Sequence, residues 1–148
     1  MLFNKKISYR NIYCNLFYEI DENRLFPQKY FKPKNTLYKY SKDNGNKKFI
    51  LTKVVDTVHF KYLLDKDNNY EIYSNYVKLT NQSDHSIEKF EKLIQNFSVE
   101  KLVNEKIKLE KIKHNNIKYY KVYDGCHRLS ILKFNDVKLN NDYFEIVN

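Results

Sequence analysis

The 148-residue sequence predicts an α+β fold in a single domain, on the strength of three stretches. Residues 87–97 carry apolar side chains at three- and four-residue spacings, the pattern of an amphipathic helix. Residues 105–113 and 117–124 alternate apolar with polar side chains around a polar turn, which predicts a hairpin. Residues 123–132, YDGCHRLSIL, run from the end of that hairpin through a glycine turn into a helix. A chain of this length buries a substantial core without a second domain.

Composition excludes several classes of protein. The formal net charge of +9 invites a nucleic-acid interpretation, but the sequence holds 24 Lys against three Arg, and the lysines are scattered among acidic residues. A DNA reader is expected to use Arg for bidentate base contacts, so DNA is not the expected partner. The first ten residues lack the apolar run of a secretory signal, and no run of ~18 apolar residues could span a membrane. We therefore expect a cytoplasmic protein without a membrane partner.

The first third of the chain mostly predicts strands and turns. Residues 12–20 are apolar and aromatic enough for a strand or a short helix. Pro27 and Pro33 bracket an extended segment, and a polar turn surrounds Gly45. Residues 48–55 are rich in β-branched side chains and predict a strand. We treat residues 1–50 as an N-terminal elaboration of the domain.

Residues 51–82 form a tyrosine-rich segment that predicts two short helices. The polar cluster DKDNN, residues 65–69, separates them. Their tyrosines are expected to line packed faces, with the wall of a ligand site as the alternative; they are Tyr62, Tyr70, Tyr73 and Tyr76.

The helix over residues 87–97 needs an N-terminal cap. Ser83 or Asp84 is placed to supply it, because a side-chain oxygen can accept from the unpaired amides of the first turn. This helix opens the segment 83–147, which we interpret as the core of the domain.

The remaining elements follow from local pattern. The hairpin turns at residues 114–116, and its alternation slips between Leu109 and Ile112, which predicts a bulge or a shorter first strand. The last helix ends near Phe134, and residues 142–147 predict a closing strand. Two cysteines are too few for a disulfide framework and lack zinc-site spacing.

The turn DGCHR, residues 124–128, carries the candidate chemistry. Gly125 permits close approach of a ligand, and the amides of Gly125, Cys126 and His127 open a helix without internal acceptors. Such a helix start binds anions, and the side chains of His127 and Arg128 add donors. Asp124 repels phosphate unless it caps the helix, binds Mg²⁺ or acts as a base.

These residues, with the preceding hairpin and the helix IEKFEKLI, resemble the ParB/sulfiredoxin-like superfamily over roughly residues 83–147. The resemblance implies a small mixed sheet with helices packed on it. It also implies that nucleotide phosphates rest on the motif helix, at the residues corresponding to Gly125, Cys126, His127 and Arg128. Residues 52–79 bear a weaker similarity to an insert of ParB-like proteins from surface-polysaccharide gene sets.

Three functions occur on the fold that the resemblance implies. Sulfiredoxins carry GGCHR, whose cysteine attacks a phosphorylated sulfinic acid, and Cys126 matches that cysteine. Free-serine kinases carry DGHHR, whose aspartate activates the substrate hydroxyl or binds metal, and Asp124 matches that aspartate. Partition-type ParB proteins carry GERR before a helix-turn-helix domain, for which too few residues follow the last predicted helix.

Asp124 favours the kinase among these functions. A carboxylate repels a sulfinyl phosphate, whereas in a kinase it orients a hydroxyl or holds Mg²⁺ against ATP or ADP. The expected activity is therefore nucleotide-dependent phosphorylation of a small hydroxyl compound such as an amino acid, amino alcohol or sugar, in surface-glycan biosynthesis. Sulfiredoxin-like reduction through Cys126 and non-catalytic nucleotide or DNA binding are the alternatives.

A kinase also needs a base that accepts the proton of the substrate hydroxyl. The serine kinases place a glutamate just before the first conserved helix, where this chain has SDHS, so Asp84 or His85 is the candidate. His59 is a candidate for lining the acceptor pocket. Glu105 and Glu110 lie on the hairpin and are expected to face water.

Overall fold

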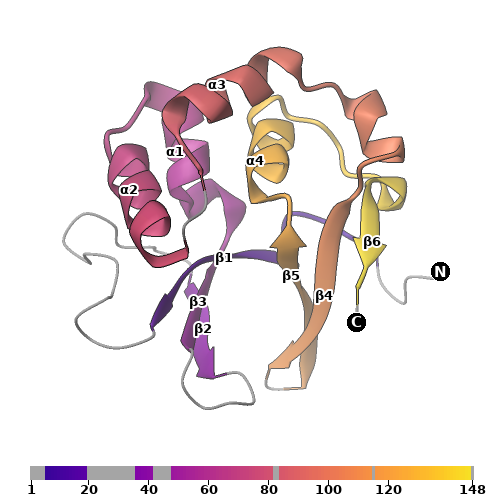
Figure 1. Cartoon of the computed structure of the whole chain (residues 1–148). Coiled ribbons are helices and arrows are strands. Elements are labelled where there is room, and N and C mark those ends of the chain that lie inside the picture. Colours follow the sequence, from indigo (N-terminus) through magenta and orange to yellow (C-terminus); the bar gives the residue numbers. More distant parts are fainter. Residues whose placement is uncertain (1–5, 20–35, 42–47, 82–83, 115, 148) are drawn as a thin grey trace.

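The computed structural model describes residues 6–19, 36–41, 48–81, 84–114 and 116–147 (Figure 1). Six strands form one mixed sheet in the order β2-β3-β1-β5-β4-β6. The strands are β1 Ile12–Glu19, β2 Thr36–Ser41, β3 Lys48–Thr52, β4 Ile107–His114, β5 Ile117–Asp124 and β6 Phe144–Ile146. The helices are α1 Val58–Asp65, α2 Asn69–Asn81, α3 Ile87–Asn96 and α4 Cys126–Phe134. The predicted α+β class and the mixed sheet are confirmed.

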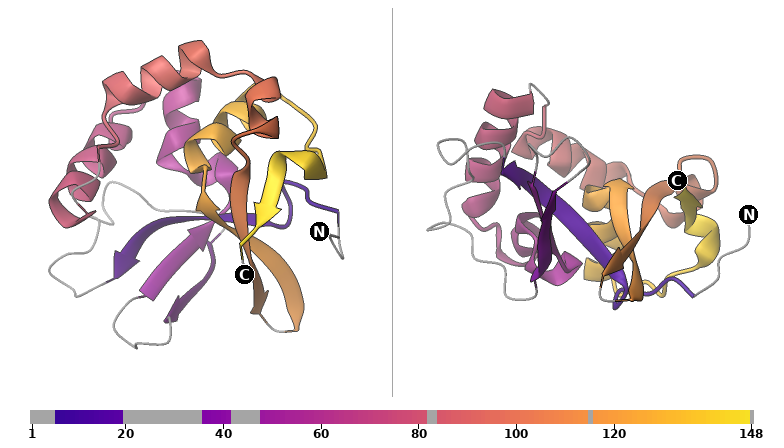
Figure 2. Two further views of the ribbon diagram at one scale, coloured as in Figure 1. Left: turned by 45° about the vertical axis from the view of Figure 1, so that its right-hand side comes forward. Right: turned by 90° about the horizontal axis from the view of Figure 1, so that it is seen from below.

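All four helices lie on one side of the sheet, as Figures 1 and 2 show. β5 lies near the centre of the sheet, parallel to β1 and antiparallel to β4. Because α4 follows β5 after a single residue, the start of α4 lies directly above the sheet centre, with α3 passing over it. This arrangement positions the predicted phosphate turn between two helices.

The two helices predicted in the tyrosine-rich segment are confirmed. α1 ends where Lys66 adopts a left-handed conformation, within the polar cluster that was expected to break the helix. The side chains of Tyr62, Tyr70 and Tyr73 are buried, as expected for packed faces. The side chain of Tyr76 lies outside the described residues.

The predicted cap of α3 is wrong. Ser86 is the N-cap, and its hydroxyl accepts from the amide of Lys89. Asp84 instead accepts from the amide of Ser86, which makes an Asx turn that leads into the cap. Ser83 lies outside the described residues. A serine directly before the first helical residue satisfies the helix amides better than an aspartate two positions earlier.

The predicted hairpin is confirmed, although its irregularity lies elsewhere. The register of β4 on β5 shifts between Lys108 and Leu109, not between Leu109 and Ile112. From Leu109 to the turn the pairing is regular, so the slip in the apolar pattern reflects side-chain choice and not backbone geometry.

Two other boundaries differ from the expectation, and one strand was not expected. β3 ends at Thr52, because residues 54–56 form a turn of 3₁₀ helix instead of continuing the strand to 55. The closing strand is shorter than 142–147, because residues 141–143 are also a 3₁₀ turn. β2 was not predicted as a strand. The segment between Pro27 and Pro33 and the turn around Gly45 lie outside the described residues.

The core lies between the sheet and the helices. Its fully buried side chains include Phe90 of α3 and Leu129 and Leu132 of α4. On β5, Tyr120 and Val122 are buried among this core, while Ile117 and Tyr123 are exposed. None of the described helices is long and apolar enough to cross a membrane.

One charged pair is buried, contrary to expectation. Glu110 was expected to face water, but its carboxylate lies 3.6 Å from the ammonium of Lys121, and both side chains are largely removed from solvent. The two residues are directly opposite each other in the β4–β5 pairing, which places opposite charges on one face of the sheet.

Candidate functional site

The site is built on the turn from β5 into α4. Gly125 has φ +117°, a conformation that side chains with a Cβ rarely adopt. A Cβ added there would lie 3.0 Å from two side-chain carbons of Ile107 and from the Arg128 guanidinium. Among the described residues, no side chain caps α4. Its first amides therefore have no partner inside the helix and remain available to an anion.

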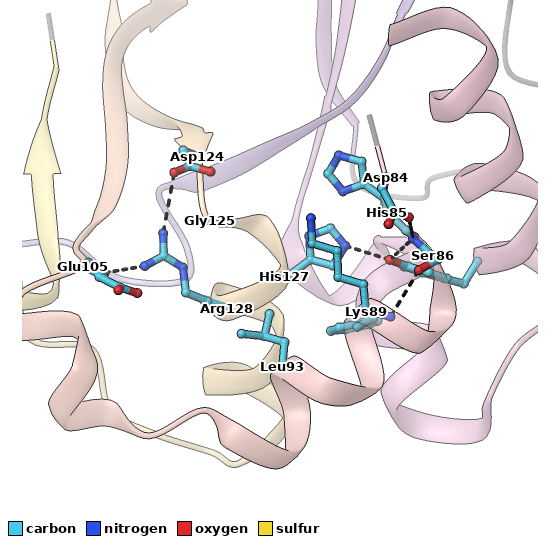
Figure 3. Close-up of a pocket in the computed structure, with 12 residues that line it drawn as sticks. Asp84, His85, Ser86, Lys89, Leu93, Glu105, Asp124, Gly125, His127 and Arg128 are labelled. Atoms are coloured by element: carbon cyan, nitrogen blue, oxygen red, sulfur yellow. Dashed lines mark hydrogen bonds and ion pairs between the residues drawn. The ribbon is translucent and has the colours of Figure 1, made fainter. Parts of the chain in front are cut away.

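A pocket of about 360 Å³ opens at this helix start (Figure 3). It lies between the start of α4, residues 89–93 of α3 and the segment that precedes α3. Its lining includes six of the eight residues that the sequence singled out. Those six are Asp84, His85, Asp124, Gly125, His127 and Arg128, and the remaining lining residues are Tyr70, Ser86, Lys89, Phe90, Leu93 and Glu105.

One side of the pocket carries Asp124 and Arg128 (Figure 3). Asp124 is 66 % exposed, and one carboxylate oxygen lies 3.8 Å from the Arg128 guanidinium. The same guanidinium donates to the backbone carbonyls of Glu105 and Lys106. Arg128 therefore ties the start of α4 to the residues before β4, and in this conformation much of its donor capacity is used within the protein.

The opposite side carries Asp84, His85 and Lys89 (Figure 3). Hydrogen bonds from the Ser86 amide and hydroxyl lower the pKa of the exposed Asp84 carboxyl. This carboxylate is thus a weak proton acceptor. Burial, together with His59 and Lys89, lowers the pKa of His85, so its ring is neutral at pH 7.

His127 lies at the back of the pocket and is the most constrained of these side chains. Its Nε2 is 2.8 Å from the hydroxyl of Tyr70. Its ring is stacked parallel to His85, with centroids 5.2 Å apart, and meets His59 edge to face at 4.2 Å. Burial, followed by the neighbouring His59 and His85, lowers the pKa of His127 well below its ordinary value. The ring is therefore neutral at pH 7.

Cys126 and His59 do not line the pocket, although both were singled out. His59 is 1 % exposed and packs behind His127, so it is not a wall of the acceptor pocket. Its Nδ1 lies 4.0 Å from the Cys126 sulfur. The Cys126 sulfur also interacts with Cys14 of β1, and this contact and His59 hold the pKa of Cys126 below its usual range. The Cys126 thiol is thus directed toward the core side of α4.

Sequence reasoning missed several lining residues. The tyrosine-rich segment predicts packing for Tyr70, with a ligand wall as the alternative, and the buried Tyr70 side chain also lines the pocket. Phe90 and Leu93 belong to the apolar stripe of α3, which gave no sign that part of the stripe faces a pocket. Nothing in the sequence distinguishes Lys89 from the other 23 lysines or indicates that it lies opposite the DGCHR turn.

The pocket offers the carboxylate of Asp124 to a nucleotide with Mg²⁺. Asp124 is exposed beside the uncapped helix start, where a carboxylate can hold a metal ion against phosphate oxygens. Within the described part of the chain, no three His, Cys, Asp or Glu side chains are grouped as a metal site. Mg²⁺ usually binds proteins through one or two carboxylates plus phosphates and water, so a single Asp124 fits that pattern.

Comparison of the chain with protein-family models, with curated proteins and with solved structures found no match.

Proposed function

We propose that the protein is a nucleotide-dependent kinase that phosphorylates the hydroxyl of a small molecule such as an amino acid, amino alcohol or sugar, in surface-glycan biosynthesis. The observation that carries the proposal is the uncapped start of α4 opening into a pocket with Asp124 at its edge. The amides of residues 126–128 would bind phosphate oxygens of ATP or ADP. The helix dipole adds to this interaction, because its positive end lies at the same place.

The acceptor would occupy the side of the pocket formed by the segment before α3. Phosphoryl transfer depends mainly on positioning and on electrostatic stabilisation of the transferred group. Asp124 would hold Mg²⁺, which neutralises phosphate charge when it is bound. Lys89 faces the same cavity and adds a positive charge opposite Asp124. A pocket of about 360 Å³ suits a small acceptor together with a phosphate group.

Sulfiredoxin-like chemistry is less well supported. That reaction needs a cysteine sulfur that reaches the phosphorylated substrate, whereas Cys126 is outside the pocket lining and its sulfur interacts with His59 and Cys14. The alternative makes a separate prediction, since Cys126→Ser would abolish reduction of a hyperoxidised peroxiredoxin. Under the kinase proposal the same variant retains transfer activity.

The test incubates the pure protein with Mg-ATP or Mg-ADP and a panel of amino acids, amino alcohols and sugars, with ³¹P NMR as the readout. We expect one class of acceptor to be phosphorylated and Asp124→Asn to lower the rate by about 100-fold or more, because the neutral amide would no longer hold Mg²⁺ against the phosphates. Asp142→Asn is the matched control, because Asp142 is exposed and outside the pocket lining. Nucleotide binding without any phosphorylated product would instead indicate a non-catalytic nucleotide-binding protein.

A further inference from the structure

Tyr70 connects the two histidines that face the pocket. It comes from the first turn of α2, its side chain is fully buried, and it is one of the residues that line the pocket. The hydroxyl oxygen lies 2.8 Å from the backbone carbonyl of His85 and 2.8 Å from Nε2 of His127. One phenol thus bridges the segment before α3 and the first turn of α4.

The two short contacts determine where the protons are. A carbonyl oxygen can only accept, so the Tyr70 hydroxyl must donate its single proton to His85. The contact with His127 is then satisfied only if Nε2 carries a proton and donates it to the Tyr70 oxygen. If Nε2 carried no proton, its lone pair would face a lone pair of the Tyr70 oxygen at 2.8 Å, because the Tyr70 proton is already donated to the His85 carbonyl.

Burial keeps both the Tyr70 hydroxyl and the His127 ring neutral. Burial raises the pKa of the Tyr70 hydroxyl, so it keeps its proton throughout the physiological range. Burial is also the main cause of the low pKa of His127, so that ring carries one proton at pH 7. With this proton on Nε2, the lone pair is on Nδ1. Within the described part of the chain Nδ1 has no hydrogen-bond partner, and it is not a fully buried atom.

We propose that Tyr70 is a positioning residue that fixes His127 as the Nε2–H tautomer and leaves Nδ1 free to accept a hydrogen bond from the ligand. This inference deepens the proposed kinase function and depends on it for the role of the ligand. It changes the expected role of His127, which becomes an acceptor for the substrate hydroxyl and not a donor to phosphate.

In the transfer step, the hydroxyl oxygen of the acceptor bonds to the terminal phosphorus of the nucleotide while the bond from that phosphorus to its bridging oxygen breaks. The hydroxyl proton moves to Nδ1 of His127, which becomes an imidazolium and later releases the proton to solvent. Tyr70 keeps the ring in place because its oxygen accepts from Nε2–H before and after this transfer. The competing base, Asp84, already accepts from Ser86.

The test of the tautomer needs no activity. Long-range ¹H–¹⁵N spectra of the imidazole rings at pH 7 should show His127 with protonated Nε2 and unprotonated Nδ1. Tyr70→Phe removes only the bridging oxygen, and we expect a mixture of both tautomers. Tyr62→Phe is the matched control, since it removes another core tyrosine hydroxyl, one bonded to Glu91 and away from the pocket. A wild-type ring protonated on Nδ1, or a ring unchanged by Tyr70→Phe, would overturn the proposal.

The role toward the substrate is tested by the pH profile of transfer. Tyr70→Phe should lower kcat about 10-fold and leave the KM for nucleotide unchanged, since only the base is affected. The acidic limb should move to lower pH, because the imidazolium loses the oxygen that accepts from Nε2. An unchanged profile would overturn the acceptor role of His127. Absence of transfer by the wild-type protein would overturn the kinase and this acceptor role together, while the spectra would still decide the tautomer.

Discussion

Gly125→Ala is the perturbation that most directly tests the geometry of the phosphate turn. The substitution adds one carbon at a residue with φ +117°. That carbon would lie 3.0 Å from Cγ1 and Cγ2 of Ile107, which is fully buried, so these atoms have little room to move. It would also lie 3.0 Å from the Arg128 guanidinium, which is held by the carbonyls of Glu105 and Lys106.

The expected cost has two parts. Backbone strain for a residue with a Cβ in such a conformation is about 1–3 kcal/mol. Overpacking against Ile107 adds about 1–3 kcal/mol, because a close-packed core accommodates an extra carbon only by shifting its neighbours. The free energy of unfolding should therefore fall by roughly 2–6 kcal/mol, a large share of the 5–15 kcal/mol typical of domains.

Urea unfolding followed by circular dichroism measures this loss. Asn116→Ala is the matched control, since Asn116 also has a positive φ, of 64°, but is exposed at the hairpin turn. The control shows what alanine costs at an exposed residue with a positive φ, and it should lose only about 1 kcal/mol, because asparagine already carries a Cβ there. If Gly125→Ala costs no more than this control, the close approach of Gly125 to Ile107 is refuted.

Three further predictions concern stability. Ser86→Ala should cost about 1 kcal/mol in urea unfolding, and Asp84→Ala distinctly less, because Ser86 is the helix cap. Below pH 6.5 stability should fall as the pH falls, because the unfolded chain binds protons that His127 and His85 do not, each worth up to about 1.4 kcal/mol per pH unit; His127→Gln should remove the share of His127 in melts from pH 7.5 to 5. Glu110→Ala should cost about 1–3 kcal/mol, because it removes the carboxylate that lies 3.6 Å from the largely buried Lys121 ammonium, and Lys121→Met in that background should recover part of the loss.

Local pattern was sufficient for most of the fold. The apolar stripe of α3 and the polar break between α1 and α2 are patterns that the chain itself carries. The hairpin was predicted as an element, but its alternation did not give the buried face of β5, where the consecutive residues Tyr120, Lys121 and Val122 are buried. β2 was missed because a six-residue strand in a polar neighbourhood has little periodicity of its own. The cap of α3 was misassigned because Ser83, Asp84 and Ser86 are all good cap residues, and their choice depends on where the helix begins.

The DGCHR turn was predictable because it is contiguous in the sequence. The direction of its side chains was not. Successive residues of a helix point about 100° apart, so Cys126 faces Cys14 and His59 while His127 faces the pocket. Tyr70 and Lys89 come from other elements, and only the packing of α2 and α3 around α4 brings them to the same cavity.

The central claim is that the amides opening α4 bind nucleotide phosphate. An amide ¹H–¹⁵N titration with ATP and ADP, each with and without Mg²⁺, tests it most directly. We predict saturable shifts that are largest at Gly125, Cys126, His127 and Arg128, and much smaller shifts with adenosine, which has no phosphate. Shifts that are absent from these four amides, or that are centred on the backbone amides of lysines elsewhere on the surface, would contradict the claim.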